Sequence, residues 1–207
     1  MSAATGQSTD AVADLHLHTY FSDGTYSPEE LAVHGAAHGL SAMALTDHDT
    51  VEGCERMAAA CASHGIEFIA ASELTAEHGN HELHILGYFL DTQHDRLLSE
   101  LARFQEVRQD RIRQIVARLH QFGVKVDPEL VFKIANCRAP GRPHVARALV
   151  QEGFCENLDE AFRRWLKKDR PAWVPKFRIT AADAIKLIHE AGGLAVLAHP
   201  GLNHADE

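Results

Sequence analysis

The sequence predicts an α/β fold with a parallel sheet and an α-helical insertion, and three observations lead to this prediction. Over residues 1–95, short apolar segments alternate with helical segments, as in βαβ units. Residues 96–178 carry only helical patterns. A His, Asp or Glu lies at or near an end of each predicted strand, and such folds gather their function at the C-terminal ends of the strands. We therefore expect one site at that edge of the sheet.

The first predicted strand covers residues 14–19, where apolar and polar residues alternate. This alternation points His16 and His18 to the same face. Asp23 follows on a Ser-Asp-Gly turn. A lone histidine is more often an ordinary core or surface residue than a ligand, but a His-x-His pair beside a turn aspartate favours metal binding.

Two helices follow within the first 95 residues. Ser27 is the expected N-cap of the first, with Pro28 at the first helical position and Glu30 closing a capping box. This helix is expected to end near Gly39, because glycine stops helices. A second helix is predicted over about residues 51–63.

The other candidate ligands belong to four further predicted strands. Each lies in or directly after an apolar segment: His48 after residues 41–45, Glu73 at the end of 66–73, His84 within 81–88, and His199 at the end of 193–199. Imidazole and carboxylate groups gathered at one rim suit Mn, Zn or Fe rather than Ca, which prefers oxygen ligands alone.

Two aspartates, Asp47 and Asp49, flank His48 and have two interpretations of equal weight. One of them orients the His48 imidazole as a hydrogen-bonding partner behind the metal. The alternative is that Asp49 caps the N-terminus of the following helix.

The insertion begins with one long helix, predicted over residues 96–122. Further helices are predicted over 143–152 and 158–168. Trp165, Trp173 and Phe177 are expected in the core of the insertion or at its seam with the sheet, and base stacking by one of them is the less favoured alternative. Thr180 is the expected cap of a helix that leads to the last strand. The predicted division is therefore a sheet-forming part, 1–95 and 179–207, interrupted by the helical insertion 96–178.

Charge separates the two parts of the chain. Residues 1–95 carry a single basic residue, Arg56, against fifteen acids, whereas 96–207 carry nineteen Lys and Arg against fourteen acids. Divalent cations would offset the acidic part, and the basic part is suited to phosphate oxygens. The alternative without a functional role is that most of these charges lie on solvated helix faces.

Composition excludes other classes. There is no apolar stretch of about 18 residues, so no transmembrane helix is expected. The four cysteines form no CxxC pair, which indicates reduced thiols in a cytoplasmic protein. No phosphate-binding P-loop and no Gly-x-Ser-x-Gly nucleophile motif is present.

Taken together, the motifs resemble the PHP (polymerase and histidinol phosphatase) family of metallohydrolases. The matching residues are His16-x-His18 with Ser22-Asp23-Gly24, Thr46-Asp47-His48-Asp49, Glu73, His84 and Ala198-His199-Pro200. The segment of residues 141–147 further resembles the stand-alone branch that removes phosphate from nucleoside 3′,5′-bisphosphates, some members of which are 5′–3′ exoribonucleases.

The resemblance implies a distorted seven-stranded (β/α)7 barrel, incomplete at the C-terminus of this chain. The family draws a late Asp-x-His pair from that region. His204 and Asp206 follow His199 too closely to supply it and are interpreted as ordinary tail residues. We expect this 207-residue form to be impaired relative to a longer one.

The resemblance also implies a cluster of two to three divalent cations, with Mn favoured and Zn, Fe or Mg as alternatives. His16 and His18 would bind the first, with Glu73 bridging to another. Asp23 and His48 would bind the second. Glu73, His84 and His199 would bind the third. These seven residues are the predicted catalytic set.

The expected function is hydrolysis of a phosphate ester, on a nucleotide or a short nucleic-acid end, by metal-activated water. Arg142 and His144 would hold a substrate phosphate, the alternative being that Arg142 pairs with a surface acid. The other functions considered are a histidinol-phosphate phosphatase and an inactive PHP module used for binding or support. The expected partner is the phosphorylated small-molecule or nucleic-acid substrate, with neither a membrane nor an obligate protein partner.

Overall fold

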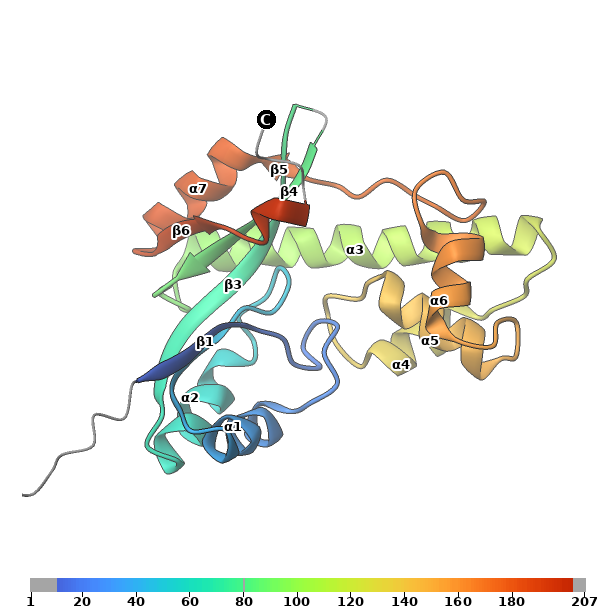
Figure 1. The fold of residues 1–207 in the computed structure, drawn as a ribbon. Helices are drawn as coiled ribbons and strands as arrows, with labels where there is room; N and C mark the ends of the chain where they lie inside the picture. The colour runs from blue at the N-terminus through green and yellow to red at the C-terminus, as the bar shows by residue number, and fades with distance from the viewer. Residues whose placement is uncertain (1–10, 80, 203–207) are drawn as a thin grey trace, which may run out of the picture.

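A computed structural model describes residues 11–79 and 81–202 of the chain (Figure 1). His204 and Asp206 lie outside the described residues. The described strands are β1 (Val12–Leu17), β2 (Leu40–Leu45), β3 (Glu67–His78), β4 (His81–Tyr88), β5 (Ile179–Thr180) and β6 (Leu194–Leu197). The helices are α1 (Pro28–Ala37), α2 (Cys54–Ser63), α3 (Asp95–Gln121), α4 (Pro128–Ala135), α5 (Arg142–Gln151), α6 (Leu158–Ala161) and α7 (Ala181–Glu190). A π-helical turn, Phe162–Leu166, continues α6.

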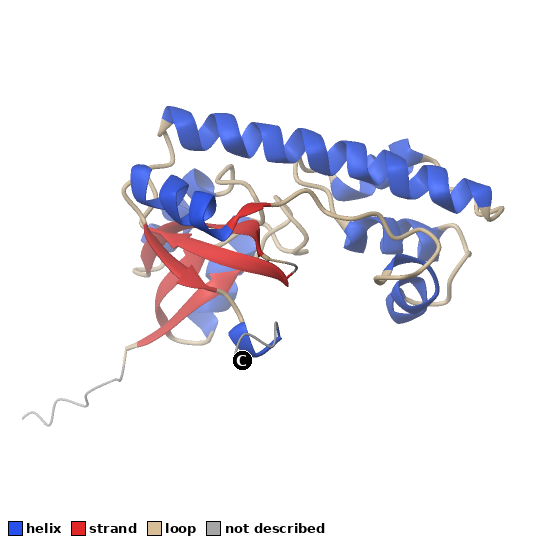
Figure 2. Cartoon of the chain, turned by 90° about the horizontal axis from the view of Figure 1, so that it is seen from above, coloured by secondary structure: helices blue, strands red, loops and turns tan. Residues whose placement is uncertain are grey.

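The strands form one curled, open sheet in the order β1-β2-β3-β4-β6, and the short β5 pairs with β3 (Figure 2). The predicted α/β class with a helical insertion is confirmed. β1, β2 and β3 are parallel, as expected, but β4 runs antiparallel to both β3 and β6, so the sheet is mixed and the expected parallel arrangement holds for its first three strands. Only two residues separate β3 from β4, and parallel neighbours need a crossover of a dozen residues or more.

Local signals set the helix starts as predicted. Ser27 caps α1, accepting the Glu30 amide while the Glu30 carboxylate accepts the Ser27 amide. Thr180 likewise caps α7 by accepting the amide of Asp183. The long helix of the insertion is confirmed as α3. The helix α4 was not predicted, although Asp127 caps it and Pro128 opens it, which is the usual start signal.

Three apolar cores hold these elements together. The first lies between α1, α2 and β2 and includes Leu31, Met43 and Met57. The second packs β3, β4 and α7 against the first half of α3. The third joins the second half of α3 to α4, α5 and the turn after α6. Thus α3 belongs to two cores and spans from the sheet to the helical cluster (Figures 1 and 2).

The aromatic residues of the insertion divide between inside and outside. Trp165 is 7% exposed and belongs to the third core, as expected. Phe177 is 41% exposed, and its ring lies 6.0 Å from that of Phe104, which belongs to the second core. The cysteines Cys54, Cys61, Cys137 and Cys155 are free thiols. Among the described residues, no helix is long and apolar enough to cross a bilayer.

Candidate metal centre

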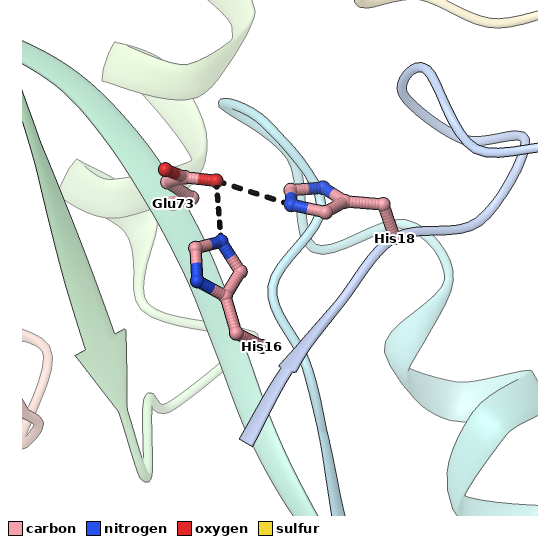
Figure 3. A group of neighbouring side chains, drawn as sticks. All are labelled: His16, His18 and Glu73. Atoms are coloured by element: carbon pink, nitrogen blue, oxygen red, sulfur yellow. Dashed lines mark hydrogen bonds and ion pairs between the residues drawn. The ribbon is translucent and has the colours of Figure 1, made fainter. Parts of the chain in front are cut away.

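Glu73 lies at the centre of the predicted ligand set. Its side chain is 1% exposed and projects from the middle of β3, because β3 continues past the expected end to pair with β4. Oε2 lies 2.9 Å from His16 Nε2 and 3.2 Å from His18 Nε2 (Figure 3). Oε1 lies 2.7 Å from His84 Nδ1 and 3.1 Å from His199 Nε2. One buried carboxylate therefore faces imidazoles from β1, from β4 and from the segment after β6.

His48 and Asp23 complete the arrangement from two loops. His48 Nδ1 lies 3.5 Å from Glu73 Oε2. Asp23 lies 3.9 Å from both His18 Nδ1 and His48 Nε2, through its two different oxygens. The structure thus brings all seven predicted ligand residues together.

Backbone hydrogen bonds fix these loops to the sheet. The Glu73 amide donates to the Asp47 carbonyl, and the Asp49 amide donates to the Glu73 carbonyl. His48 is thereby held as an isolated bridge beside Glu73. The Ala198 amide donates to the His84 carbonyl, which sets the position of His199. His84 itself reaches the site from the middle of an antiparallel strand, not from a strand end as expected.

Neither interpretation of the aspartates beside His48 is correct. The Asp47 carboxylate accepts hydrogen bonds from the Thr19 amide, the Thr19 hydroxyl and the Ser22 hydroxyl. The Asp49 carboxylate accepts from the Thr75 amide and from Arg108. The α2 helix begins at Cys54, so Asp49 is not its cap. Both aspartates instead fix loops around the site.

Gly24 allows the turn that carries Asp23 to close. A Cβ at this position would lie 2.4 Å from the His18 carbonyl oxygen and 2.7 Å from its carbon. These are backbone atoms, so a side chain would have to displace the loop.

We predict that Gly24→Ala destabilises the protein by about 1–3 kcal/mol and weakens metal binding, because the added methyl group moves the His18–Asp23 loop. Chemical denaturation and metal titration measure the two effects. Gly201→Ala, whose Cβ would meet open space, serves as the control. Wild-type stability and metal affinity in Gly24→Ala would contradict the prediction.

The charge states of the cluster follow from its contacts. Burial alone would raise the pKa of Glu73, but hydrogen bonds from His18 and His84 outweigh it and hold that pKa well below its usual range. Burial likewise opposes protonation of His18 and His84, yet the bonds to Glu73 raise the pKa of both. Burial and the nearby Arg108 lower the pKa of His48 well below its ordinary value.

The donor set fits transition metals. Three groups bring one ligand atom of each residue within 4.8 Å of the others: His16, His18 and Glu73; His18, Asp23 and His48; His48, Glu73 and His84. The buried atoms His48 Nδ1 and His199 Nδ1 make no hydrogen bond with any described residue. Buried polar atoms are normally satisfied, and metal ions would supply partners for imidazoles around an ionised carboxylate.

A basic pocket of about 120 Å³ opens beside Asp23 and His48. Four cationic side chains line it: Arg108 and Arg111 from α3, Arg142 from the start of α5, and Lys176. Only Arg142 was predicted. Arg108 and Arg111 lie three apart on α3 and therefore share a face, which is the signal that sequence reasoning could have used.

Arg142 has no acidic partner within the described residues; Nη1 donates to the Leu166 carbonyl at 3.3 Å. Pairing with a surface acid, the alternative considered above, is therefore not observed.

His144, the second residue predicted to hold a substrate phosphate, is buried rather than exposed to the pocket. It is 1% exposed, and its Nδ1 accepts the Gly141 amide at 2.9 Å, which fixes the turn before Arg142. It is not among the residues lining the basic pocket, and its role toward substrate stays a prediction.

Burial and the nearby Arg147 lower the pKa of His144 to about 4. The folded protein therefore binds fewer protons than the unfolded chain between about pH 6.5 and 4, so this residue makes stability fall as the pH falls through that range. We predict that His144→Gln, which keeps an acceptor and cannot titrate, flattens this loss by at most about 3 kcal/mol. Denaturation at several pH values measures it, and identical pH profiles would contradict the prediction.

An open α/β sheet gathers five histidines and two carboxylates at one face, and this arrangement is typical of metallohydrolases. Comparison with known proteins gives the family. The PHP domain model matches residues 14–168, and the chain belongs to the PHP domain family.

Relatives support the resemblance to the stand-alone branch. The chain is 35% identical to the 3′,5′-nucleoside bisphosphate phosphatase of Chromobacterium violaceum, over 91% of this chain and 66% of that protein. It is also 35% identical to the 5′-3′ exoribonuclease Rnm of Salmonella typhimurium, over 97% of this chain and 70% of that protein.

A solved structure from Bifidobacterium adolescentis, assigned as a metal-dependent phosphoesterase, superposes with a TM-score of 0.87 at 30% identity, covering 93% of this chain and 68% of that one. The chain spans about two thirds of the length of these relatives.

Proposed function

We propose that this protein is a metal-dependent phosphoesterase that acts on a nucleotide or a short nucleic-acid end. The observation that carries the proposal is the position of a four-cation pocket directly beside a His and carboxylate cluster, with Asp23 and His48 belonging to both. Two regions with complementary tasks are thus joined: one suited to divalent cations, the other to phosphate oxygens.

His16, His18 and Glu73 would hold one metal ion, Asp23 and His48 a second, and Glu73, His84 and His199 a third. When bound, divalent cations polarise phosphoryl oxygens and lower the pKa of a water molecule. The donor set suits Mn, our first choice, as well as Zn and Fe. Glu73 stays ionised because the surrounding imidazoles hold its pKa low.

The chain's own residues bind and orient the substrate. Arg142 suits a phosphate because its guanidinium can donate two parallel hydrogen bonds. Arg111 is held by the Val174 carbonyl, a neutral partner, and contributes fixed positive charge to the pocket wall. Arg108 is paired with Asp49 and Lys176 with Glu82, so these two offer oriented N–H donors more than free charge. Fixed charges need no reorganisation when a phosphate arrives, which favours binding.

Two separate regions for phosphate favour a substrate with two phosphates. A nucleoside 3′,5′-bisphosphate or a 5′-phosphorylated RNA could place one phosphate at the cluster and another in the basic pocket, in keeping with the names of the two relatives. Histidinol phosphate has a single phosphate and would leave the pocket unused. An inactive PHP module would not need an intact donor set, and all seven predicted donors are present here.

A phosphate-release screen of the purified chain with Mn²⁺ tests the proposal. The substrates are adenosine 3′,5′-bisphosphate, a short 5′-phosphorylated RNA and histidinol phosphate. We expect turnover of the first or second and little of the third. Preferred turnover of histidinol phosphate would change the substrate class. Tight metal binding without release from any substrate would favour the inactive module.

A further inference from the structure

Glu82 is a partly buried carboxylate that the proposed mechanism leaves unexplained. It lies on β4 two residues before His84, so both side chains project from the same face of the strand. Glu82 Oε1 lies 3.4 Å from His84 Nε2. The opposite ring nitrogen, Nδ1, lies 2.7 Å from Glu73 Oε1. The His84 imidazole is therefore bracketed by two carboxylates, one at each nitrogen.

Two cations fix the Glu82 side chain in this place. Lys176 Nζ lies 2.6 Å from Oε1, and Arg178 Nη2 lies 3.1 Å from Oε2. Both cations come from the segment that leads from the insertion back to the sheet. Their side chains are only 15% and 18% exposed, so solvent screens these pairs less than it screens surface pairs. Glu82 is thus held at both oxygens, and Oε1 faces His84 as well as Lys176.

The position of Glu82 bears on which nitrogen of a neutral His84 imidazole carries the proton. Only one of its two nitrogens carries a proton, and the other keeps the lone pair that a metal needs. His84 Nε2 is buried and makes no hydrogen bond with any described residue, and the Glu82 carboxylate oxygen Oε1 faces it at 3.4 Å. A proton directed to Nε2 leaves Nδ1 free on the side of Glu73.

We infer that Glu82 is a positioning residue that holds the His84 imidazole in the orientation and tautomer required for metal binding. The inference rests on the proposed metal cluster and assigns a role to a residue outside it. Because Lys176 also lines the basic pocket, Glu82 joins the phosphate region to one edge of the cluster.

The test compares Glu82→Ala with a matched control, Glu77→Ala. Glu77 is the cross-strand neighbour of Glu82 on β3 and lies 3.5 Å from the same Arg178, but it is 42% exposed. Mn²⁺ affinity and stoichiometry are measured by calorimetry and elemental analysis of the purified proteins, and kcat and KM by phosphate release. We expect Glu82→Ala to weaken at least one Mn²⁺ site by about 10- to 100-fold.

The kinetic pattern separates positioning from a general structural effect. In Glu82→Ala, kcat at low Mn²⁺ should fall and recover at high Mn²⁺, because added metal compensates for a misoriented ligand but does not repair a folding defect. Glu77→Ala should match the wild type. Equal Mn²⁺ affinity in Glu82→Ala and wild type would overturn the inference.

Two further outcomes are distinguishable. A wild-type chain that binds no Mn²⁺ would contradict the proposed function itself, whatever the variants do. If Glu82→Ala does not fold, Glu82→Gln decides, because it keeps an acceptor oxygen and loses the charge that Lys176 and Arg178 hold. Its Mn²⁺ affinity should lie between those of Glu82→Ala and the wild type, and an unchanged value would overturn the inference.

Discussion

Replacing Glu73 with Gln is expected to abolish phosphate release and to empty most of the metal cluster. Glu73 belongs to two of the three candidate ligand groups, and its two oxygens face imidazoles on both sides. The amide keeps the shape but loses the charge that the cations need. Losing several kcal/mol of charge stabilisation corresponds to a fall in kcat of about 10³-fold or more. Steady-state kinetics and elemental analysis of the same preparation measure both effects.

Glu67→Gln is the matched control, because Glu67 lies exposed at the start of the same strand. It should leave metal content and turnover unchanged. A Glu73→Gln protein that retains wild-type metal content and turnover would show that the carboxylate is not part of the reactive centre.

Arg142→Ala is expected to raise KM for a substrate with two phosphates by about 10- to 150-fold, which corresponds to about 1.5–3 kcal/mol of lost charge-assisted hydrogen bonding. The structure strengthens this expectation, since the guanidinium lines the basic pocket and has no competing carboxylate among the described residues. A substrate with a single phosphate should be affected less. Metal content should not change, because the guanidinium stays protonated and offers no lone pair.

Arg163→Ala is the control for this variant, because Arg163 is an exposed residue of the same insertion that does not line the pocket. Unchanged kinetics of Arg142→Ala on both kinds of substrate would remove the start of α5 from substrate binding.

Structural features that depend on residues close together in the sequence could be predicted, whereas features that depend on contacts between distant residues could not. The caps at Ser27 and Thr180 use residues three positions apart, so the sequence contains the whole interaction. The direction of β4 depends on the hairpin with β3, and a regular strand-helix alternation hides it. His84 was identified from its place in the motif pattern, although its geometry relative to the strand was not.

The basic pocket could not be predicted for the same reason. Arg108, Arg111 and Lys176 become neighbours only when α3 and the returning segment pack beside the site. The partners of Asp47 and Asp49 also come from other loops and strands, and for this reason neither proposed local role was correct. Sequence identified the seven candidate ligands that the structure brings together, whereas their supporting contacts needed the tertiary fold.

Because α3 packs in two separate cores, the length of this helix between them is constrained. Phe104 packs in the core against the sheet, Ile112 packs in the core of the insertion, and Arg108 and Arg111 lie on the turns between them. Each added residue there would rotate everything beyond it by about 100° and advance it by about 1.5 Å. One inserted residue would thus turn the insertion's core-facing stripe away from its partners. Tolerated insertions and deletions should therefore fall in exposed connections such as 167–171, and the spacing between these two anchoring points should stay constant.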